Sequence, residues 1–393
     1  MSYTLKLSNY KSTRDRSLII NNGLTILSSP NAGGKSSVVE AFGLCLGLEK
    51  KALGVESLKQ VINDRANFCS VSLDVRVPGV AIQKMAVEIR RELEEDDEGD
   101  EENEEEEEDD TDDDEKFVTR FLNGTKTTEE DFLAAARPLG TNVLGTVLGV
   151  VNHDVINRSP SNDRELTKYL RMMSGARAHS QTPAYKRAKK TVRASEIHSE
   201  KLKRMEDALK KEPRNENTLE KELSHIRMRK AIEEKKDAAE VIIREGEERR
   251  EAAFRRFVAE VSARMDGFVR LFWNDQRNIR TWMEVKASGK VELKCQEGGE
   301  NAFKADLVAV SGGERRIIQL ALSFSILAQF NVPLAIVDNA DKSFFKENGT
   351  RILKFCDLVL ENSQTMKAIV LVGNDQHNFF RYAQSEGYNI LRI

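Results

Sequence analysis

The segment Ser29-Pro30-Asn31-Ala32-Gly33-Gly34-Lys35-Ser36 decides the fold of the first part of the chain. An apolar run at residues 24–27 precedes it and has the length of a buried strand. After Lys35 the apolar side chains recur at helical spacing, at Val38, Val39, Phe42 and Leu46. The sequence therefore predicts a strand, a glycine-rich loop and a helix, in that order.

The same segment fits the phosphate-loop pattern G-x-x-x-x-G-K-[ST], except that Ser29 stands at the position of the first glycine. In such a loop, backbone N–H groups and the helix N-terminus point at one phosphate anion. Lys35 is expected to reach the β- and γ-phosphates of a nucleotide, and the Ser36 hydroxyl is expected to hold Mg²⁺. The residues predicted to bind nucleotide here are Asn31, Gly33, Gly34, Lys35, Ser36 and Ser37.

The chain has 393 residues and a formal net charge of −4, but its charges are unevenly distributed. Of its 65 acidic residues, 20 lie within residues 92–115. The other 45 acidic residues face 61 basic ones, so the rest of the chain carries a formal charge of +16. This excess favours an anionic partner.

Residues 92–115 are of low complexity and lack the apolar groups that would stabilise an ordered structure. A strand and turn resume after them, with Phe121-Leu122-Asn123-Gly124. We therefore predict a disordered acidic insertion between two strands of one sheet. Two interpretations stay open: a solvated loop without a specific partner, and a loop that contacts histone-like or internal basic surfaces.

Composition excludes several classes of protein. No apolar stretch approaches the roughly 18 residues that span a bilayer, and the N-terminus lacks the apolar core of a signal peptide. The four cysteines lie far apart without a Cys-x-x-Cys pair, which argues against a zinc site and a disulfide framework. We expect a soluble intracellular protein that does not associate with membranes.

Residues 164–272 are mostly helical in pattern. The clearest heptad lies at the end of this region, at Phe254, Val258, Val261, Met265, Phe268 and Phe272. Shorter heptads precede and follow a breaker cluster at residues 213–217, at Leu202, Met205 and Leu209 and at Leu219, Leu223 and Ile226. We predict two antiparallel arms of about 45 residues each, with the tip near residues 213–217.

The last part of the chain alternates strands and helices, which indicates an α/β sheet. A β-hairpin is predicted around Ser288-Gly289. Ser311-Gly312-Gly313-Glu314 then precedes a helical pattern. An apolar strand at residues 334–337 ends in Asp338, and residues 369–372 form a second buried strand.

Ser-Gly-Gly-Glu before a helix resembles the signature motif of ABC-type ATPases. The order of phosphate loop, long helical hairpin, signature and acid-ended strand resembles the structural-maintenance-of-chromosomes (SMC) family. Pro30-Asn31 is similar to the phosphate loop of that family, and residues 121–124 are similar to its strand–turn element. The resemblance covers roughly residues 1–90, 117–180 and 268–393.

This resemblance implies an α/β fold, that of an SMC- or RecF-like ABC-ATPase head from which an antiparallel coiled-coil hairpin protrudes. The head would be assembled from an N-terminal lobe at residues 1–163 and a C-terminal lobe at residues 273–393, with the hairpin at residues 164–272.

The resemblance also implies ATP and Mg²⁺ as cofactors, with Ser36 and Asp338 at the metal ion. In the family, the signature caps the γ-phosphate of a nucleotide held by the opposite subunit, so the capping residues would be Ser311, Gly312, Gly313 and Glu314. The expected partners are a second SMC-type head, identical or different, a kleisin-like subunit and DNA without sequence preference.

Among SMC proteins, this chain most resembles the sixth SMC subunit of the five–six DNA-repair complex. Residues 57–64, Ser-Leu-Lys-Gln-Val-Ile-Asn-Asp, resemble the segment after its phosphate-loop helix. Gly373-Asn374-Asp375-Gln376 also follows it in lacking the usual switch histidine. This similarity implies a nuclear, chromosome-associated protein of DNA repair and chromosome structure.

The departures from the family concern hydrolysis. Asn339 stands at the position of the catalytic glutamate, and an amide cannot accept a proton from water. Asp341 matches a family acid further along and is a candidate substitute. His153 stands where the family has a glutamine that contacts metal and water. We expect slow or absent turnover with nucleotide binding retained.

The hairpin is much shorter than family arms, and it has no room for a globular hinge. The sequence leaves open a natural miniature and a head from which the middle was removed. A Gly-Ser linker of the engineered kind is absent from the sequence, which favours the natural form.

Basic residues cluster on the first arm, where DNA would be gripped through its phosphates. A solvated coiled-coil face is an equally good interpretation. The candidate DNA-binding residues are Lys186, Arg187, Lys189, Lys190, Arg193, Lys203 and Arg204.

The leading hypothesis is therefore an ATP-binding, DNA-associated SMC-type head with its nucleotide between two heads. A RecF-type DNA-repair ATPase with active turnover is the first alternative. The second is a scaffold that has lost nucleotide and binds an SMC or kleisin partner. Whether the chain is an enzyme is left open by its degenerate catalytic positions.

Overall fold

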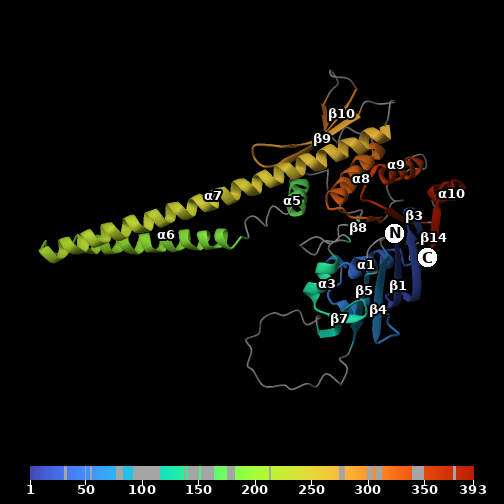
Figure 1. The fold of residues 1–393 in the computed structure, drawn as a ribbon, viewed down its shortest axis with the longest axis horizontal. Coiled ribbons are helices and arrows are strands. Elements are labelled where there is room, and N and C mark those ends of the chain that lie inside the picture. The colour runs from blue at the N-terminus through green and yellow to red at the C-terminus, as the bar shows by residue number, and fades with distance from the viewer. Residues whose placement is uncertain are drawn as a thin grey trace. The chain divides into compact units, whose positions relative to one another are not determined.

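The computed structural model divides the chain into two compact units (Figure 1). Unit 1 comprises Met1–Leu166, Glu260–Lys286 and Lys290–Ile393, and unit 2 comprises Thr167–Ala259 with Ala287–Gly289. The structure describes residues 1–30, 33–48, 50–53, 55–76, 83–91, 116–136, 139, 150–151, 163–174, 182–211, 214–273, 279–298, 304–306, 312–338, 349–374 and 378–393. Both ends of the chain belong to unit 1; the finer division at residues 163 and 272 stays a prediction.

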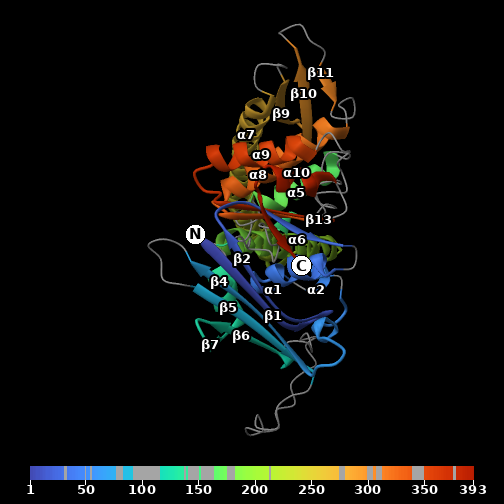
Figure 2. The same cartoon turned by 90° about the vertical axis from the view of Figure 1, so that its right-hand side faces the viewer.

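Unit 1 contains a six-stranded antiparallel sheet in the order β2-β1-β4-β5-β6-β7 (Figure 2). Its strands are β1 (Ser2–Tyr10), β2 (Thr13–Asn21), β4 (Phe68–Arg76), β5 (Gln83–Arg90), β6 (Val118–Leu122) and β7 (Thr125–Thr127). β5 pairs with β6, with Met85 opposite Leu122, so the acidic run does connect neighbouring strands, as predicted. Residues 92–115 themselves lie outside the described residues.

A second sheet of unit 1 is parallel and has the order β14-β3-β13-β12-β8. Its strands are β3 (Gly23–Ser29), β8 (Val150–Val151), β12 (Leu334–Val337), β13 (Ala368–Asn374) and β14 (Asn389–Arg392). β12 and β13 are buried along their whole length, which is why they appear in the sequence as continuous apolar runs. The predicted strands before the glycine-rich loop and before Asp338 are both confirmed.

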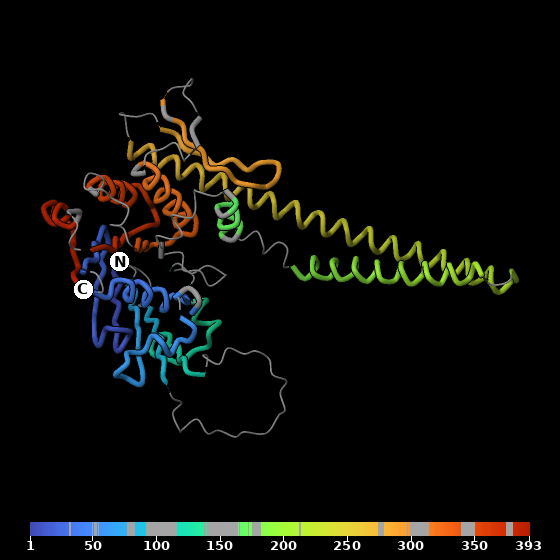
Figure 3. The backbone as a smooth tube through the Cα atoms, turned by 180° about the vertical axis from the view of Figure 1, so that it is seen from behind, coloured from blue at the N-terminus to red at the C-terminus, as the bar shows by residue number. Residues whose placement is uncertain are grey.

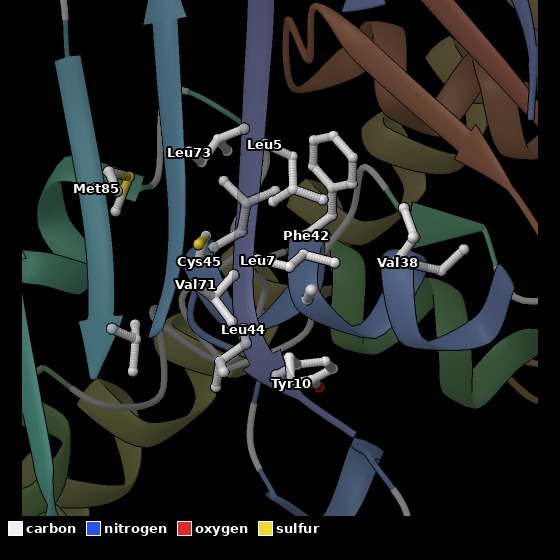
Figure 4. Close-up of a cluster of buried hydrophobic side chains, with 14 of the residues drawn as sticks. Leu5, Leu7, Tyr10, Val38, Phe42, Leu44, Cys45, Val71, Leu73 and Met85 are labelled. Carbon is white, nitrogen blue, oxygen red and sulfur yellow. The ribbon is translucent and has the colours of Figure 1, made fainter. Parts of the chain in front are cut away.

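The helix α1 (Lys35–Cys45) packs in a core shared by the two sheets. Figure 4 shows Val38 and Phe42 of α1 among side chains from the inner face of the antiparallel sheet, such as Leu5, Val71 and Met85. The same core includes residues of the parallel sheet: Leu27, Leu334, Ile336, Ala368, Val370 and Val372. Short elements complete this part: α2 (Lys50–Leu53), the 3₁₀ turn η1 (Leu58–Val61) and α3 (Glu129–Ala136).

The remaining helices of unit 1 bring an aromatic cluster together. Phe355 stacks on Phe324 at 5.9 Å and meets the edge of Phe272 at 5.6 Å, measured between ring centroids. These rings come from α9, α8 and the end of the long helix α7. The helices are α7 (Glu216–Trp273), α8 (Gly312–Gln329), α9 (Gly349–Asn362) and α10 (Asn378–Ser385).

A three-stranded antiparallel sheet follows α7, in the order β11-β10-β9. Its strands are β9 (Ile279–Val285), β10 (Val291–Glu297) and β11 (Lys304–Asp306), and the predicted hairpin at Ser288-Gly289 is confirmed. The N–H groups of Thr281 and Met283 donate to Asp266 and Ser262 of α7, at 2.8 and 2.9 Å. Side chains of α7 therefore serve as hydrogen-bond partners for β9.

Unit 2 is built around a hairpin of α6 (Pro183–Leu209) and the first part of α7 (Figure 3). The helix α5 (Asp163–Met173) precedes it, and Arg171 of α5 donates to the carboxylate of Glu251 and the carbonyl of Gly289. The prediction of an antiparallel hairpin is confirmed, but its two equal arms of about 45 residues are wrong. α6 has 27 residues and α7 has 58, because α5 is a separate helix and α7 continues into unit 1.

The predicted heptads hold at the base of α7 and fail near the tip. Leu202 and Leu209 are buried as expected, but Met205, Leu219, Leu223 and Ile226 are 52–61% exposed. Thr218 and His225 are buried in their place. Thr218 belongs to a reciprocal cap at the start of α7: its N–H donates to the Asn215 side chain at 2.9 Å, and Asn215 N–H donates to the Thr218 hydroxyl at 2.7 Å. The hydrogen bonds of the Thr218 hydroxyl are thus satisfied where it is buried, and the next residue, Leu219, is exposed.

Across the described ranges, no helix combines the length and the apolar character that are needed to cross a membrane.

Candidate nucleotide-binding site

Three of the predicted site segments meet at one edge of the parallel sheet. β3 ends at Ser29, β13 ends at Asn374, and Asp338 directly follows β12. In the register, Asn374 stands opposite Ser29, and Leu371 stands opposite both Ile26 and Val337. Because these strands are parallel, their carboxyl ends share an edge, and in open α/β sheets ligands bind at this edge.

The glycine-rich loop joins this edge to α1. The Gly33 N–H donates to the Pro30 carbonyl at 3.1 Å, which closes a turn. Gly34 caps α1 with a φ of 87°, a left-handed conformation that glycine adopts without strain. The first turn of α1 carries no acidic residue that would offset the partial positive charge at its N-terminus.

Lys35 places its ammonium group over this loop. Its Nζ donates to the carbonyl oxygens of Ser29 at 2.8 Å and Pro30 at 2.7 Å. An ammonium group has three N–H donors, so two hold the side chain in place and the third is available for a phosphate oxygen. The described part of the loop therefore combines a fixed cation with a helix N-terminus, an arrangement that suits a phosphate chain.

The possible Mg²⁺ ligands are an exposed hydroxyl and a half-buried carboxylate. Ser36 is exposed at the start of α1, whereas Ser37 is buried, so Ser36 is the more accessible of the two hydroxyls. Asp338 is half-buried beyond the end of β12. Hydroxyl and carboxylate oxygens are hard ligands that Mg²⁺ prefers, so the donor set fits this ion.

The signature segment lies at the start of α8. Gly312 and Gly313 begin the helix, and Glu314 lies in its first turn, where an acidic side chain complements the helix dipole. Arg316 follows and is 2% exposed; burial lowers the pKa of its guanidinium to about 10, so it stays charged at neutral pH. The other site predictions, for Asn31, His153, Ser311, Asn339 and Asp341, lie outside the described residues.

Two tertiary features around the loop, an ion pair and a close neighbour of Gly34, were not predicted from the sequence. Lys11, in the turn between β1 and β2, forms an ion pair with Glu40 of α1. Thr13 of β2 is buried, and its hydroxyl would lie 3.8 Å from a Cβ on Gly34. Both features bring together residues that are more than 20 positions apart, so no local pattern signals them.

The candidate DNA-binding residues all lie on α6. All seven are exposed, and within the described part of the chain none of them forms an ion pair. Lys189 lies 5.0 Å from the ring centroid of Tyr185, a cation–π contact that leaves its charge in place. Their positions avoid the buried side of the helix, which is formed by Tyr185, Ala188, Ser195, Leu202 and Leu209.

Comparison with known proteins gives one family. The model of the RecF/RecN/SMC N terminal domain matches residues 2–379. A curated relative, the chromosome partition protein Smc of Mesomycoplasma hyorhinis, is 35% identical over 74 residues. That match covers 19% of this chain and spans only 7% of the relative.

Solved structures agree in fold. The Smc head domain of Pyrococcus furiosus, with an extended coiled coil and bound to the C-terminal domain of ScpA, gives a TM-score of 0.61 at 19% identity, covering 95% of this chain and 90% of that one. The Smc head domain of Pyrococcus yayanosii, with a coiled coil and joint, gives a TM-score of 0.58 at 15% identity. This match covers 95% of this chain and 92% of that one. A further Smc head, bound to the C-winged helix domain of ScpA, gives a TM-score of 0.55 at 16% identity. This match covers 95% of this chain and 89% of that one. The fold is thus the mixed α/β fold of these heads, with a long helix of the coiled-coil arm.

Proposed function

Because the chain belongs to the RecF/RecN/SMC N-terminal domain family, we propose that it is an SMC-type head that binds ATP with Mg²⁺ and associates with chromosomal DNA. The observation that carries this proposal is the geometry of Lys35, whose ammonium is fixed over the glycine-rich loop by the carbonyls of Ser29 and Pro30. This geometry keeps a positive charge where the phosphate chain of a nucleotide would lie.

Each residue of the site has a role in this proposal. The N–H groups of the loop and of the first turn of α1 bind phosphate oxygens, and Lys35 contacts the β- and γ-phosphates. Ser36 and Asp338 hold the metal ion, which when bound neutralises part of the phosphate charge. Asn374 lies at the end of β13, is 7% exposed and is paired with Ser29 at the same edge of the parallel sheet.

The nucleotide would be shared between two heads. Ser311, Gly312, Gly313 and Glu314 of one head cap the γ-phosphate of ATP bound at Lys35 of the other, which is an identical or a different SMC-type head. We also propose a kleisin-like subunit as a partner. This part rests on the fold that the chain shares with heads that were solved together with domains of ScpA.

Hydrolysis is proposed to be slow or lost. A general base must orient and deprotonate the attacking water, and its help is worth about 10²–10⁴-fold in rate. Asn339 follows Asp338 at the position of this base and has no proton-accepting group at neutral pH. Asp341 is the first carboxylate after Asn339 along the chain and is proposed as its substitute.

DNA binding is proposed for the exposed basic face of α6, through phosphates and without sequence preference. The charges of this face support it, since none is neutralised by an ion pair among the described residues. The resemblance of residues 57–64 and 373–376 to the sixth SMC subunit extends the proposal to a nuclear protein of DNA repair.

A thermal-shift titration tests the function. ATP with Mg²⁺ at 100 times its Kd should stabilise the protein by about 2.7 kcal/mol, whereas Mg²⁺ alone should not. An unchanged melting temperature at millimolar ATP would favour the nucleotide-free scaffold instead. DNA-stimulated hydrolysis in the same preparation would favour the active RecF-type ATPase.

A further inference from the structure

Ser29 occupies a space that the loop leaves free by having a glycine at position 33. A Cβ atom on Gly33 would lie 1.6 Å from Ser29 Oγ, 2.9 Å from Ser29 Cβ and 3.1 Å from the Pro30 carbonyl oxygen. Ser29 itself is 1% exposed, so its side chain lies inside the protein rather than in solvent. The serine and the glycine therefore fit one another, and a side chain at 33 would clash most severely with Ser29.

The same side chain takes part in the hydrogen bonding of the loop. The Ser29 hydroxyl donates to the Pro30 carbonyl at 3.2 Å. That carbonyl also accepts the Gly33 N–H at 3.1 Å and the Lys35 ammonium at 2.7 Å. Lys35 makes its second bond to the carbonyl of Ser29. Ser29 is thus joined to both carbonyls that hold the ammonium group.

We propose that Ser29 is a positioning residue of the phosphate loop. Its side chain packs against Gly33 and holds the Pro30 carbonyl in place, and this carbonyl in turn positions Lys35 for a phosphate chain. This inference rests on the proposed nucleotide-binding function and gives a role to a residue that differs from the phosphate-loop pattern. The sequence alone treats Ser29 as a position that has drifted.

The two views of Ser29 make opposite predictions for one substitution. If Ser29 is drift, Ser29→Gly restores the phosphate-loop pattern and should leave ATP binding unchanged or improve it. If Ser29 positions the loop, Ser29→Gly empties the space beneath Gly33 and adds backbone freedom, so the affinity for ATP should fall about three- to tenfold. Ser29→Ala keeps the Cβ and removes the hydroxyl, so its affinity for ATP should lie between those of the wild type and Ser29→Gly.

A double-mutant cycle at Ser29 and Gly33 tests the fit directly. The four proteins are the wild type, Ser29→Gly, Gly33→Ala and the double variant, and calorimetry measures the Kd for ATP with Mg²⁺ at about 25 °C. Gly33→Ala should weaken binding strongly in the wild type, because the new Cβ meets the Ser29 side chain. In the Ser29→Gly background the same change should cost less, because only the Pro30 carbonyl, 3.1 Å away, is then close to the new Cβ.

The control and the ligand-free readout separate positioning from folding. Gly267→Ala, on α7 with open space around its would-be Cβ, should leave the Kd unchanged. A merely structural role of Ser29 would lower the melting temperature of Ser29→Gly without changing its Kd, and this result would overturn the proposal. So would an equal effect of Gly33→Ala in both backgrounds. If neither the wild type nor any variant binds ATP, the proposed function fails. The fit of Ser29 against Gly33 is then tested by melting temperature alone. It is refuted if the change in melting temperature of the double variant equals the sum of the changes in the two single variants.

Discussion

The ring of Tyr185 lies so close to Gly246 that its Cδ2 atom is 2.7 Å from the position a Cβ on residue 246 would take. Tyr185 is 3% exposed, and its hydroxyl donates to Glu247 at 3.2 Å. α6 and α7 can approach this closely because residue 246 has no side chain. The hairpin is therefore fixed at this end by a large residue facing a glycine.

Gly246→Ala should destabilise the hairpin. Alanine favours the helix over glycine by about 1 kcal/mol, but overpacking a fixed contact costs about 1–3 kcal/mol, so a net loss of about 1 kcal/mol is expected. Urea unfolding followed by circular dichroism measures this loss. Gly267→Ala, in the same helix with nothing near its Cβ, is the matched control and should be neutral or stabilising. Equal stabilisation by both substitutions would mean that Tyr185 does not limit the approach.

The four cysteines should resist modification in the native protein. All four are buried. Burial raises the pKa of the Cys69 thiol to about 12, and burial also raises the pKa of the Cys45 and Cys356 thiols. A raised pKa keeps the thiol protonated at about pH 8, and the thiolate is the reactive form. Ellman's reagent at this pH should therefore label the native protein slowly and the urea-unfolded protein rapidly. Rapid labelling of the native form would contradict the burial of these side chains.

DNA binding should depend on salt through the basic face of α6. Neutralising Lys189, Lys190, Arg193 and Lys203 together should flatten the plot of log K against log salt by about one unit for each DNA phosphate that is no longer bound. Fluorescence anisotropy with unrelated duplexes gives the slope and tests the lack of sequence preference. Arg249→Gln is the control, because Arg249 is paired with Glu245 at 2.8 Å. An unchanged slope in the fourfold variant would leave α6 as a solvated face.

Catalysis should respond to the residue after Asp338. The wild-type protein is expected to hydrolyse ATP barely above background, and Asn339→Glu should raise the rate by supplying a general base. Single-turnover hydrolysis with a partner head present measures both forms. Substantial wild-type activity that disappears in Asp341→Asn would identify Asp341 as the displaced base. Activity that survives this change would place the base elsewhere.

Local patterns were sufficient to predict much of the fold. The apolar run before Ser29, the helical spacing after Lys35 and the acid at the end of residues 334–337 all depend on near neighbours, and the structure confirms their elements. The predicted seam at the hairpin tip was wrong because the buried positions there hold polar residues, Thr218 and His225, and the apolar spacing marks the residues beside them. A sequence pattern shows which apolar residues could face a partner helix, but a polar residue such as Thr218, whose hydrogen bonds are satisfied locally by Asn215, can be buried instead.

The candidate site was predictable as a motif but not as a geometry. The spacing of Gly34 and Lys35 indicates a phosphate loop. The sequence pattern does not show, however, that the Ser29 side chain occupies the place where a Cβ on Gly33 would lie. The ion pair of Lys11 with Glu40 joins two elements through tertiary packing and was missed for the same reason.

The affinity of the protein for ATP with Mg²⁺, with and without the Lys35 ammonium, tests the central claim most directly. Lys35→Ala removes charge-assisted contacts of about 1.5–3 kcal/mol, so the Kd measured by calorimetry should rise by about one to two orders of magnitude. Lys84→Ala, which removes an exposed lysine of β5, should leave the Kd unchanged. Equal affinity of the wild type and Lys35→Ala would contradict the assignment of this loop as a nucleotide site.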